Sequence, residues 1–564
     1  MSQILIKATN NLRNLLNDAV KKACENGELC SGQDLDFAVE IPADRSHGDF
    51  ATNIAMVSAK VFRLPPKKIA EIIISNLNLE NTMFKKVEVA GPGFINFFLS
   101  NLFYISVLRD IENLGSNYGR SNFGKSEKVM VEFVSANPTG PMHMGNARGG
   151  AIGDCLSAVL DAAGYDVYKE FYINDAGNQI EKFALSLDIR YQQIYKGEES
   201  VILPEDSYHG EDITELAKLF AEKYGNTFID KDEKTRRQAL VEFALPINIE
   251  KMKKDMKKYR IEYDNWFHES ALHNNGEVSD VINILKNKGL TYELDGAVWY
   301  RATKFGAEKD EVLIRNNGTP TYFAADIAYH RNKFEKRGFE KCIDVWGADH
   351  HGHVARLKGA MDAIDLDGTK LDIVLMQLVR LVRNGEVVRM SKRTGKAIQL
   401  ADLLDEVPID AARFLFNMRD PNSQMEFDLD LAVKEDSQNP VYYVQYAHAR
   451  ICSILKSIES DGVKIRKCTD EEIGLLNAPE EIDLINHLAS YTSEIIASAK
   501  DYDPARITRY VITLATLFHK FYNSCRVKCE NESLMQARIM LCLSVKTVIK
   551  NVLEMFKISV PEVM

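Results

Sequence analysis

The sequence predicts a multidomain protein in which an α/β core with a doubly wound parallel sheet lies between an N-terminal α+β domain and a C-terminal all-α domain. A chain of 564 residues exceeds what one hydrophobic core supports, so three or four domains are expected. From residue 128 a β-branched run, a glycine-bearing loop, a helical pattern and a second strand-like run follow one another, as in the βαβ unit of a parallel sheet. Beyond residue 405 the periodicity is almost wholly helical.

The composition is that of a globular protein, with 45% hydrophobic and 27% charged residues. No apolar stretch reaches the roughly 20 residues of a membrane span. The amphipathic N-terminal segment lacks the features of a signal peptide, so we expect a cytoplasmic protein without a membrane partner. The net charge of −11 argues against wholesale nucleic-acid affinity but leaves room for a local basic surface.

The expected domains follow from changes in pattern along the chain. The first, 1–118, alternates helical and extended segments and ends near a polar, glycine-bearing linker at 118–127. The α/β core covers 119–400 and includes a largely helical, lysine-rich insertion around 180–290, whose lysines we interpret mainly as a solvated helix face. A connecting helical segment, 401–436, leads to the C-terminal helical domain, 437–564.

The loop at 135–150, SANPTGPMHMGNARGG, lies at the carboxyl end of the first core strand, where ligands of such sheets bind. Gly140 and Gly145 permit close approach of the backbone, and His143 lies near the start of the following helix. Backbone amides and the positive end of a helix dipole attract phosphate, and an imidazole can donate to it. The loop alone is equally consistent with a simple tight turn.

A second loop, residues 389–396, reads RMSKRTGK and follows a hairpin turn at Asn384 and Gly385. Taken alone it is typical of a solvated charged turn. Together with the first loop it could supply cations to the triphosphate of ATP from the opposite side.

Two groups of residues suggest a metal at first sight. The nine cysteines are scattered, and the closest pair, Cys525 and Cys529, has no matching pair to complete a zinc site, so we interpret them as reduced thiols. In GADHHGH, neighbouring histidines of a strand would point to opposite faces, so the cluster would have to bend to converge on an ion. We expect no protein-bound metal.

Specific motifs resemble those of a known family. PTGPMHMGN resembles the HIGH signature of class I aminoacyl-tRNA synthetases, and RMSKR resembles their KMSKS signature. VEFVSANPTGPMH, FYINDAGNQI, DGAVWYRAT, GTPTYFAADIAYH, VWGADHHGH and NPVYYVQYAHARI are all similar to segments of bacterial arginyl-tRNA synthetases. The resemblance extends over essentially the whole chain and implies a Rossmann-like catalytic core of class I.

The resemblance implies an arginine-tRNA ligase. Such an enzyme forms arginyl-adenylate from L-arginine and ATP, with Mg²⁺ accompanying the ATP, and transfers arginine to the terminal adenosine of its cognate tRNA. The family also leads us to expect a monomer and a requirement for bound tRNA in the first step. Two alternatives remain at this point: a class I enzyme for another substrate, and a non-catalytic paralogue that only binds tRNA.

The resemblance assigns the nucleotide site to both loops and to the GADHHGH segment. It implies catalytic roles for His143, Asn146, Lys392 and Arg393. The implied ATP contacts are Gly140, Pro141, His143, Gly145, Asn146, Gly347, Asp349, His350, His353, Met390, Ser391 and Lys392. Asn146 stands where the family usually has a second histidine, and Arg389 where it has a lysine, so the strength of charge stabilisation at Asn146 is in question.

A guanidinium has five in-plane donors, so a selective pocket for it requires carboxylates. Tyr322 and Asp326 are four residues apart and share one face if their segment is helical, and Glu269 supplies a second acid. Each acid could instead be a helix cap or part of a surface ion pair. The residues that the resemblance implies for arginine binding are Glu132, Ser135, Asn137, Glu269, Tyr322, Asp326 and Asp349.

A helix over 441–458 has one apolar stripe, with Tyr442, Tyr446 and Arg450 on a neighbouring ridge. Aromatic rings and an arginine at this spacing can stack on unstacked RNA bases, although helix packing explains them equally well. The resemblance makes this domain the anticodon-binding bundle. It also makes the N-terminal domain, with Phe50 and Asn53, a second tRNA-contacting part.

Overall fold

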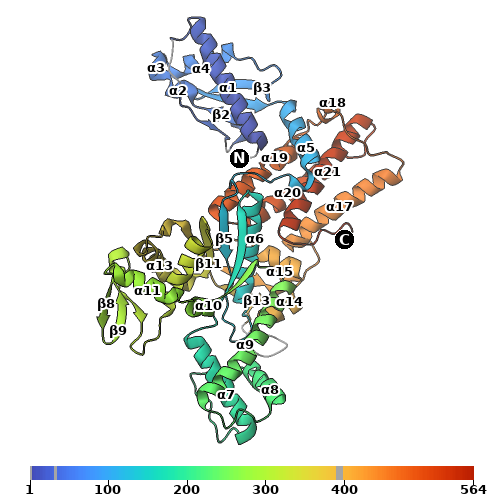
Figure 1. The fold of residues 1–564 in the computed structure, drawn as a ribbon. Helices are drawn as coiled ribbons and strands as arrows, with labels where there is room; N and C mark the ends of the chain where they lie inside the picture. Colours follow the sequence, from blue (N-terminus) through green and yellow to red (C-terminus); the bar gives the residue numbers. More distant parts are fainter. Residues whose placement is uncertain (1–2, 31–34, 43, 389–397) are drawn as a thin grey trace.

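The computed structural model describes residues 3–30, 35–42, 44–388 and 398–564. The N-terminal domain packs helices on a four-stranded antiparallel sheet of order β1-β2-β4-β3. Figure 1 places this domain at one end of the molecule. Its elements are α1 (Gln3–Glu25), β1 (Val39–Glu40), β2 (Phe50–Thr52), α2 (Ile54–Val57), α3 (Ala59–Phe62), α4 (Pro66–Asn76), β3 (Phe84–Ala90), β4 (Phe94–Leu99) and α5 (Asn101–Leu114).

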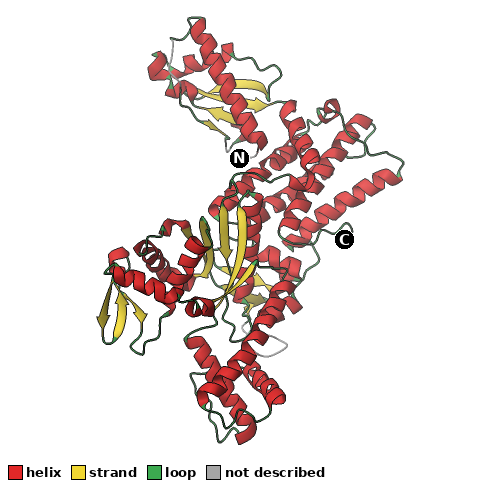
Figure 2. Ribbon diagram, viewed as in Figure 1, coloured by secondary structure: helices red, strands yellow, loops and turns green. Residues whose placement is uncertain are grey.

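The central domain is built on a five-stranded parallel sheet of order β12-β11-β5-β6-β7, which confirms the expected α/β core. The β-branched and aromatic runs form its strands, and consecutive side chains of β5, β6 and β11 are buried, as in a parallel sheet covered on both faces. Figure 2 shows helices on both sides of these strands. The elements are β5 (Lys128–Glu132), α6 (Gly145–Ala162), β6 (Asp166–Ile173), β7 (Asn265–His268), α10 (Glu269–Asn274), α11 (Glu277–Asn287), α12 (Tyr322–Arg331), β11 (Lys341–Gly347), α13 (His351–Ala363) and β12 (Leu371–Met376).

Two insertions project from this domain (Figure 1). The first is a three-helix unit with its own core, made of α7 (Asn178–Lys196), α8 (Glu211–Tyr224) and α9 (Glu233–Lys258). It ends earlier than expected, because β7, within the range assigned to the helical insertion, pairs with β6 in the central sheet. The second carries a small antiparallel sheet of β8 (Thr291–Leu294), β9 (Ala297–Tyr300) and β10 (Glu311–Ile314).

A small connecting unit follows the central sheet, with strands in the order β14-β13-β15. The Asn384-Gly385 turn joins β13 to β14 as expected, with Asn384 at a φ of 52° and Gly385 at 76°. The elements are β13 (Val379–Arg383), β14 (Glu386–Val387), α14 (Leu400–Glu406), α15 (Ile409–Phe416), β15 (Met425–Asp428) and α16 (Leu429–Ala432).

The C-terminal domain is a helical bundle, as the periodicity predicted (Figure 2). The apolar stripe expected on α17, from Val441 to Ile458, is buried in its core. The helices are α17 (Pro440–Ser460), α18 (Asp470–Ile473), α19 (Pro479–Asp501), α20 (Ala505–Ser524) and α21 (Glu532–Met555). No helix among the described residues is long and apolar enough to cross a membrane.

Candidate active site

The first expected ligand loop leaves the sheet through a strained turn. Val134 and Ser135 both have positive φ, 71° and 44°, which is costly for a β-branched residue. The Ser135 hydroxyl donates to Glu132 Oε1 at 2.9 Å and accepts the Tyr172 backbone N–H at 3.1 Å. These two bonds hold the turn at the carboxyl end of β5, next to Asn137.

The loop then runs to the start of α6, as the βαβ pattern predicted. The Asn146 side-chain oxygen accepts the His143 backbone N–H at 2.9 Å, and the Asn146 N–H returns a bond to the His143 carbonyl. Asn146 therefore closes the turn that presents His143 at the helix N-terminus. The sequence did not predict that Asn146 supports this turn. It raised only the question whether the Asn146 amide could replace a histidine in charge stabilisation.

Variants of Asn146 separate support of the turn from charge stabilisation. Asn146→Ala removes the acceptor of the His143 N–H and is expected to lower the rate of arginine-dependent pyrophosphate exchange about fivefold, from the loss of one hydrogen bond. Asn146→His should change that rate by less than about threefold, because an imidazole nitrogen can accept the same N–H. A gain of several orders of magnitude in Asn146→His would mean that the natural motif is impaired.

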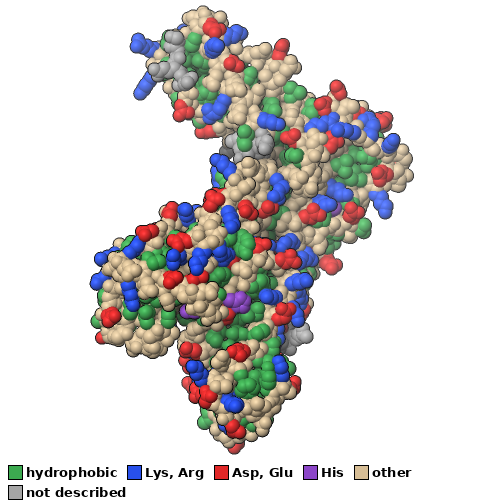
Figure 3. Space-filling model, in the orientation of Figure 1, with side chains coloured by type: hydrophobic (Ala, Val, Ile, Leu, Met, Phe, Trp, Pro, Cys, Tyr) green, Lys and Arg blue, Asp and Glu red, His purple; other side chains and the backbone are tan. Residues whose placement is uncertain are grey.

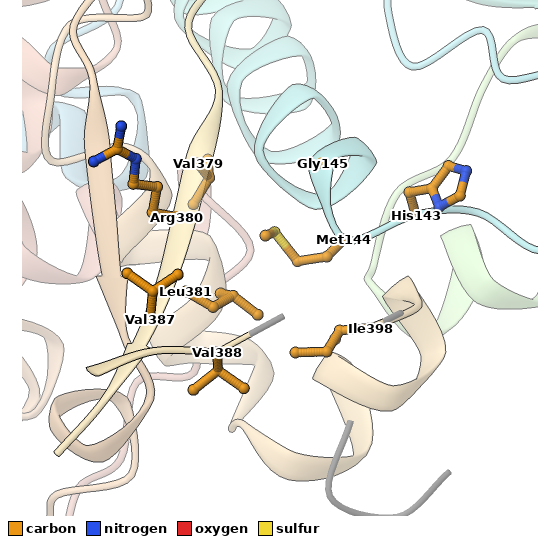
Figure 4. A pocket seen from close by; sticks show the side chains of 9 residues that line it. All are labelled: His143, Met144, Gly145, Val379, Arg380, Leu381, Val387, Val388 and Ile398. Carbon is orange, nitrogen blue, oxygen red and sulfur yellow. The ribbon is translucent and has the colours of Figure 1, made fainter. Parts of the chain in front are cut away.

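A cavity of about 630 Å³ opens beside this loop (Figure 4). Met144 extends toward β13, while the His143 ring lies on the other side of the start of α6. The cavity is lined by His143, Met144, Gly145, Val379, Arg380, Leu381, Val387, Val388 and Ile398. Its walls therefore combine backbone of the first loop with apolar side chains of the connecting unit.

The segment after the second expected loop pairs with the first. Leu400 N–H donates to the Met142 carbonyl at 2.9 Å, and Met144 N–H donates to the Ile398 carbonyl at 3.2 Å. Val388, on the other flank, lines the same cavity. The residues of the second loop expected to contact ATP, Met390, Ser391 and Lys392, and the expected catalytic Arg393 lie outside the described residues.

The expected guanidinium ligands Tyr322, Asp326 and Glu269 form a second group of neighbouring polar side chains. Tyr322 and Asp326 both lie on α12, which confirms the helix from which their shared face was inferred. The Tyr322 hydroxyl accepts the Gln179 backbone N–H at 3.2 Å, so the start of α7 borders this pocket. Figure 3 shows histidine side chains together where the lobe of α11 and α13 meets the rest of the central domain.

Asp326 is oriented by a chain of polar contacts. His353 Nε2 lies 2.9 Å from Asp326 Oδ2, and Arg356 Nη2 lies 3.2 Å from His353 Nδ1. Because a guanidinium can only donate, the Nδ1 atom must accept and the imidazole proton resides on Nε2, facing Asp326. His353, expected at the nucleotide, thus contacts the carboxylate assigned to arginine.

Glu269 is the second acid of the pocket and is only 2% exposed. It follows β7 directly and begins α10. In the amide orientation that satisfies its neighbours, Asn174 donates to Glu269 Oε2 at 3.1 Å. Asp175 fixes the start of α10 by accepting bonds from the Ser270 N–H and hydroxyl, at 2.8 and 2.9 Å. Both acids are therefore held rather than free at the surface.

A buried charge cluster lies beneath the first loop. Lys333, in a π-helical turn after α12, donates to Glu132 Oε2 at 2.6 Å and to both Asp344 oxygens at 2.9 and 3.1 Å. Burial alone lowers the pKa of Lys333, but the two carboxylates outweigh burial and raise it. Glu132, expected to bind the backbone end of arginine, is 6% exposed and already paired. Its contacts in this structure support the Ser135 turn.

The remaining nucleotide residues lie where β11 ends. Asp349 and His350 form an exposed turn between β11 and α13, with side chains more than half exposed. Gly347 closes β11, and Trp346 contacts the His350 and His353 rings. Within the described ranges, no three His, Cys, Asp or Glu side chains form a group that could hold a metal ion.

The residues expected to contact tRNA differ in exposure. Tyr446 is 40% exposed and its ring lies near His519, while the Arg450 guanidinium lies 4.5 Å from the centre of the Tyr522 ring. Tyr442 is partly buried on the same helix. The ridge of Tyr442, Tyr446 and Arg450 therefore exposes an aromatic ring, that of Tyr446.

Phe50 requires a correction. It is 1% exposed and packs edge-on against Phe84 in the N-terminal core, so its ring cannot stack on a base. Asn53, expected beside it, accepts the Ala38 backbone N–H at 2.9 Å and ties β2 to the preceding segment.

Three family models match the chain in order: the arginyl tRNA synthetase N-terminal domain over 10–99, the class I (R) tRNA synthetase catalytic domain over 110–452, and the DALR anticodon binding domain over 444–564. The fold and the paired loops thus define a class I aminoacyl-tRNA synthetase.

The curated relatives specify the family further. The chain is 55% identical to the arginine-tRNA ligase of Acetivibrio thermocellus over all of both chains, and 57% identical to that of Caldanaerobacter subterraneus, again over the whole of both. It belongs to the arginyl-tRNA synthetase family. The solved Thermus thermophilus arginyl-tRNA synthetase shares the fold, with a TM-score of 0.71, 21% identity, and coverage of 98% of this chain and 100% of that one.

Proposed function

We propose that two neighbouring sites together activate arginine: the cavity beside His143 binds ATP, and the group of side chains around Asp326 binds the amino acid. The chain is an arginine-tRNA ligase and uses ATP as a class I enzyme. The observation that supports this division of labour is the pair of held carboxylates, Glu269 and Asp326, neither of which lines the cavity beside His143. Two acids match a guanidinium, which offers several donors in one plane.

Our proposal for arginine binding assigns the side chain to Glu269, Asp326 and Tyr322. Asn137 and Ser135, just after β5, and the exposed Asp349 are proposed for the backbone end of the amino acid. Since Glu132 is paired with Lys333 and Ser135, we propose that it acts by holding the turn. This arrangement would place the arginine carboxylate near the first loop.

Nucleotide binding is proposed for the backbone at Gly140, Pro141 and Gly145, with His143 donating to phosphate oxygens as charge develops. Asn146 keeps that loop closed. For the second loop we propose phosphate contacts from Met390, Ser391, Lys392 and Arg393, since both flanks of this segment reach the His143 cavity. Gly347 and His350 are proposed for adenosine.

The chemical step needs no nucleophilic side chain. The arginine carboxylate attacks the α-phosphorus, the bond to pyrophosphate breaks, and arginyl-adenylate forms. The protein's part is alignment of the two substrates and stabilisation of the charge that builds on the phosphate oxygens. Magnesium would enter as a partner of the ATP phosphates rather than on a protein site of its own.

Transfer to tRNA engages the outer domains. We propose that Tyr442, Tyr446 and Arg450 of α17 contact the anticodon region, supported by the exposed ring of Tyr446. We propose the N-terminal domain as a second region of contact with tRNA, in which Asn53 takes part and the buried Phe50 does not. We further propose that the enzyme works as a monomer in the cytoplasm.

The deciding measurement is arginine-dependent exchange of pyrophosphate into ATP, with and without cognate tRNA, followed by charging of that tRNA. We expect exchange with arginine and tRNA present, and none with lysine or citrulline. Because the family resemblance predicts that bound tRNA is required, exchange should fall sharply when it is omitted. No exchange under the complete conditions would overturn the proposed site.

A further inference from the structure

Tyr172 has a buried hydroxyl that the proposed site has not used. It lies one residue before the end of β6 and is only 9% exposed. Its ring packs against Tyr329, with 4.5 Å between ring centres, and stacks on Phe267. Among the described residues no hydrogen bond of good geometry reaches this hydroxyl, although the Glu269 carboxylate lies close enough to interact with its proton. A buried polar group without a well-formed hydrogen bond is costly, so its presence needs an explanation.

The charges around this hydroxyl are those of the proposed arginine pocket. Burial raises the pKa of Tyr172 well above its ordinary value, and the Glu269 and Asp326 carboxylates raise it further. The hydroxyl is therefore neutral, with one proton to donate and lone pairs to offer. Glu269 and Asp326 come from β7–α10 and α12, so Tyr172 is the β6 contribution to a pocket walled by three elements.

We propose that Tyr172 is a specificity-determining residue for arginine, donating its proton to the Glu269 carboxylate and accepting a guanidinium N–H with its oxygen. This assignment rests on the proposed function of the pocket. In the bound state a guanidinium N–H gives the hydroxyl oxygen the donor that it lacks in the free enzyme. The energy of burying it is thus recovered only when a ligand with an N–H at that position is present.

The geometry favours a guanidinium over other side chains. A neutral hydroxyl beside two carboxylates adds an uncharged acceptor to two charged ones, and a guanidinium has enough in-plane donors for all three. The ammonium of lysine is compact and cannot reach acceptors on three elements at once. The ureido oxygen of citrulline would face carboxylates that offer it no donor. A site of this kind rejects ligands that leave its acceptors unpaired.

The neighbouring Tyr329 provides a matched control. Its ring contacts Tyr172, but its hydroxyl donates to Glu170 Oε1 at 2.6 Å, and Glu170 also pairs with Arg337. Tyr329 is therefore a structural tyrosine with a satisfied hydroxyl. Tyr172→Phe and Tyr329→Phe each remove one hydroxyl oxygen from the same aromatic cluster. The Tyr172 oxygen belongs to the proposed pocket, whereas the Tyr329 oxygen makes a structural hydrogen bond.

The test compares Tyr172→Phe, Tyr329→Phe and the unmodified enzyme in tRNA charging and in thermal unfolding with and without arginine. For Tyr172→Phe we expect the arginine KM to rise about ten- to a hundredfold, as for a lost hydrogen bond to a charged group, with the ATP KM unchanged. The unfolding midpoint of the free enzyme should stay the same or rise, while the increase produced by arginine should shrink. Tyr329→Phe should show the opposite pattern: a lower midpoint and an unchanged arginine KM.

The outcomes distinguish this proposal from the one on which it rests. If the unmodified enzyme charges tRNA with arginine but Tyr172→Phe has an unchanged arginine KM, only the proposed role of Tyr172 is overturned. Tyr172 would have a structural role instead if two results were found together. The thermal unfolding midpoint of arginine-free Tyr172→Phe would fall as far as that of Tyr329→Phe, and its arginine KM and ATP KM would rise by the same factor. No charging by the unmodified enzyme would overturn both proposals.

Discussion

Asp326→Asn is expected to raise the arginine KM about a hundredfold or more, while the ATP KM changes less than about twofold. The substitution removes a negative charge from the guanidinium pocket but keeps the shape and one oxygen. That oxygen can still accept the His353 Nε2 proton, so the orientation by Arg356 should survive. The expected rise in the arginine KM is therefore caused by the loss of charge complementarity with the guanidinium of the substrate.

Steady-state charging assays, with arginine and ATP varied separately, measure this effect. Asp280→Asn, an exposed aspartate on α11 of the same lobe, serves as a control and should leave both KM values unchanged. An equal rise of the arginine and ATP KM values in Asp326→Asn would count against the proposed separation of the two pockets.

The largest effect on stability is expected for Lys333→Met. Lys333 is fully buried and is the cation between Glu132 and Asp344, so its removal leaves two buried carboxylates whose remaining side-chain partners are the Ser135 hydroxyl and the His330 imidazole. Breaking a buried pair in this way costs about 3–5 kcal/mol. Denaturant unfolding at neutral pH should show that decrease in the free energy of unfolding, and the support of the Ser135 turn should weaken with it.

The same variant should acquire an unusual pH dependence. In the native protein the Lys333 ammonium helps to hold the pKa of Asp344 below its ordinary value, against the opposing effect of burial. Without that cation, burial favours the protonated acids and their folded pKa values should exceed the unfolded ones. Stability from such groups is present at low pH and lost as pH rises through the folded pKa, so the deficit of Lys333→Met should be smaller at pH 5 than at pH 8.

Adding Glu132→Gln to Lys333→Met removes one of the two unpaired charges and should restore part of the lost stability. A deficit that is independent of pH and not reduced by the second substitution would mean that packing, rather than charge, explains the cost of removing Lys333.

Features with a regular repeat could be predicted from the sequence. The spacing of Tyr322 and Asp326 placed both on one helical face, and the βαβ pattern placed the SANPTGPMH loop at the ligand edge of the sheet. The hairpin at Asn384-Gly385 followed from the conformations that those residues favour. Each of these inferences depends on neighbours that are close along the chain.

Features that depend on distant neighbours could not be predicted. Lys333 is indistinguishable in sequence from the surface lysines around it, and only the tertiary fold brings it 2.6 Å from Glu132. Tyr172 reads as an ordinary strand residue until β7 and α12 place carboxylates beside it. Phe50 was assigned to tRNA by resemblance alone, because exposure cannot be read from a residue type that suits either a core or a contact surface.

The pairing of residues 398–400 with the first ligand loop has a consequence for how this enzyme tolerates variation. The link between the two loops consists of main-chain atoms, the Leu400 and Met144 amides and the Met142 and Ile398 carbonyls. Nearly every amino acid carries those atoms, so divergence at these positions would leave the link in place. Proline is the exception, since it lacks the amide proton. We therefore expect these positions to accept substitutions by chemically different side chains, but positions 144 and 400 should not accept proline.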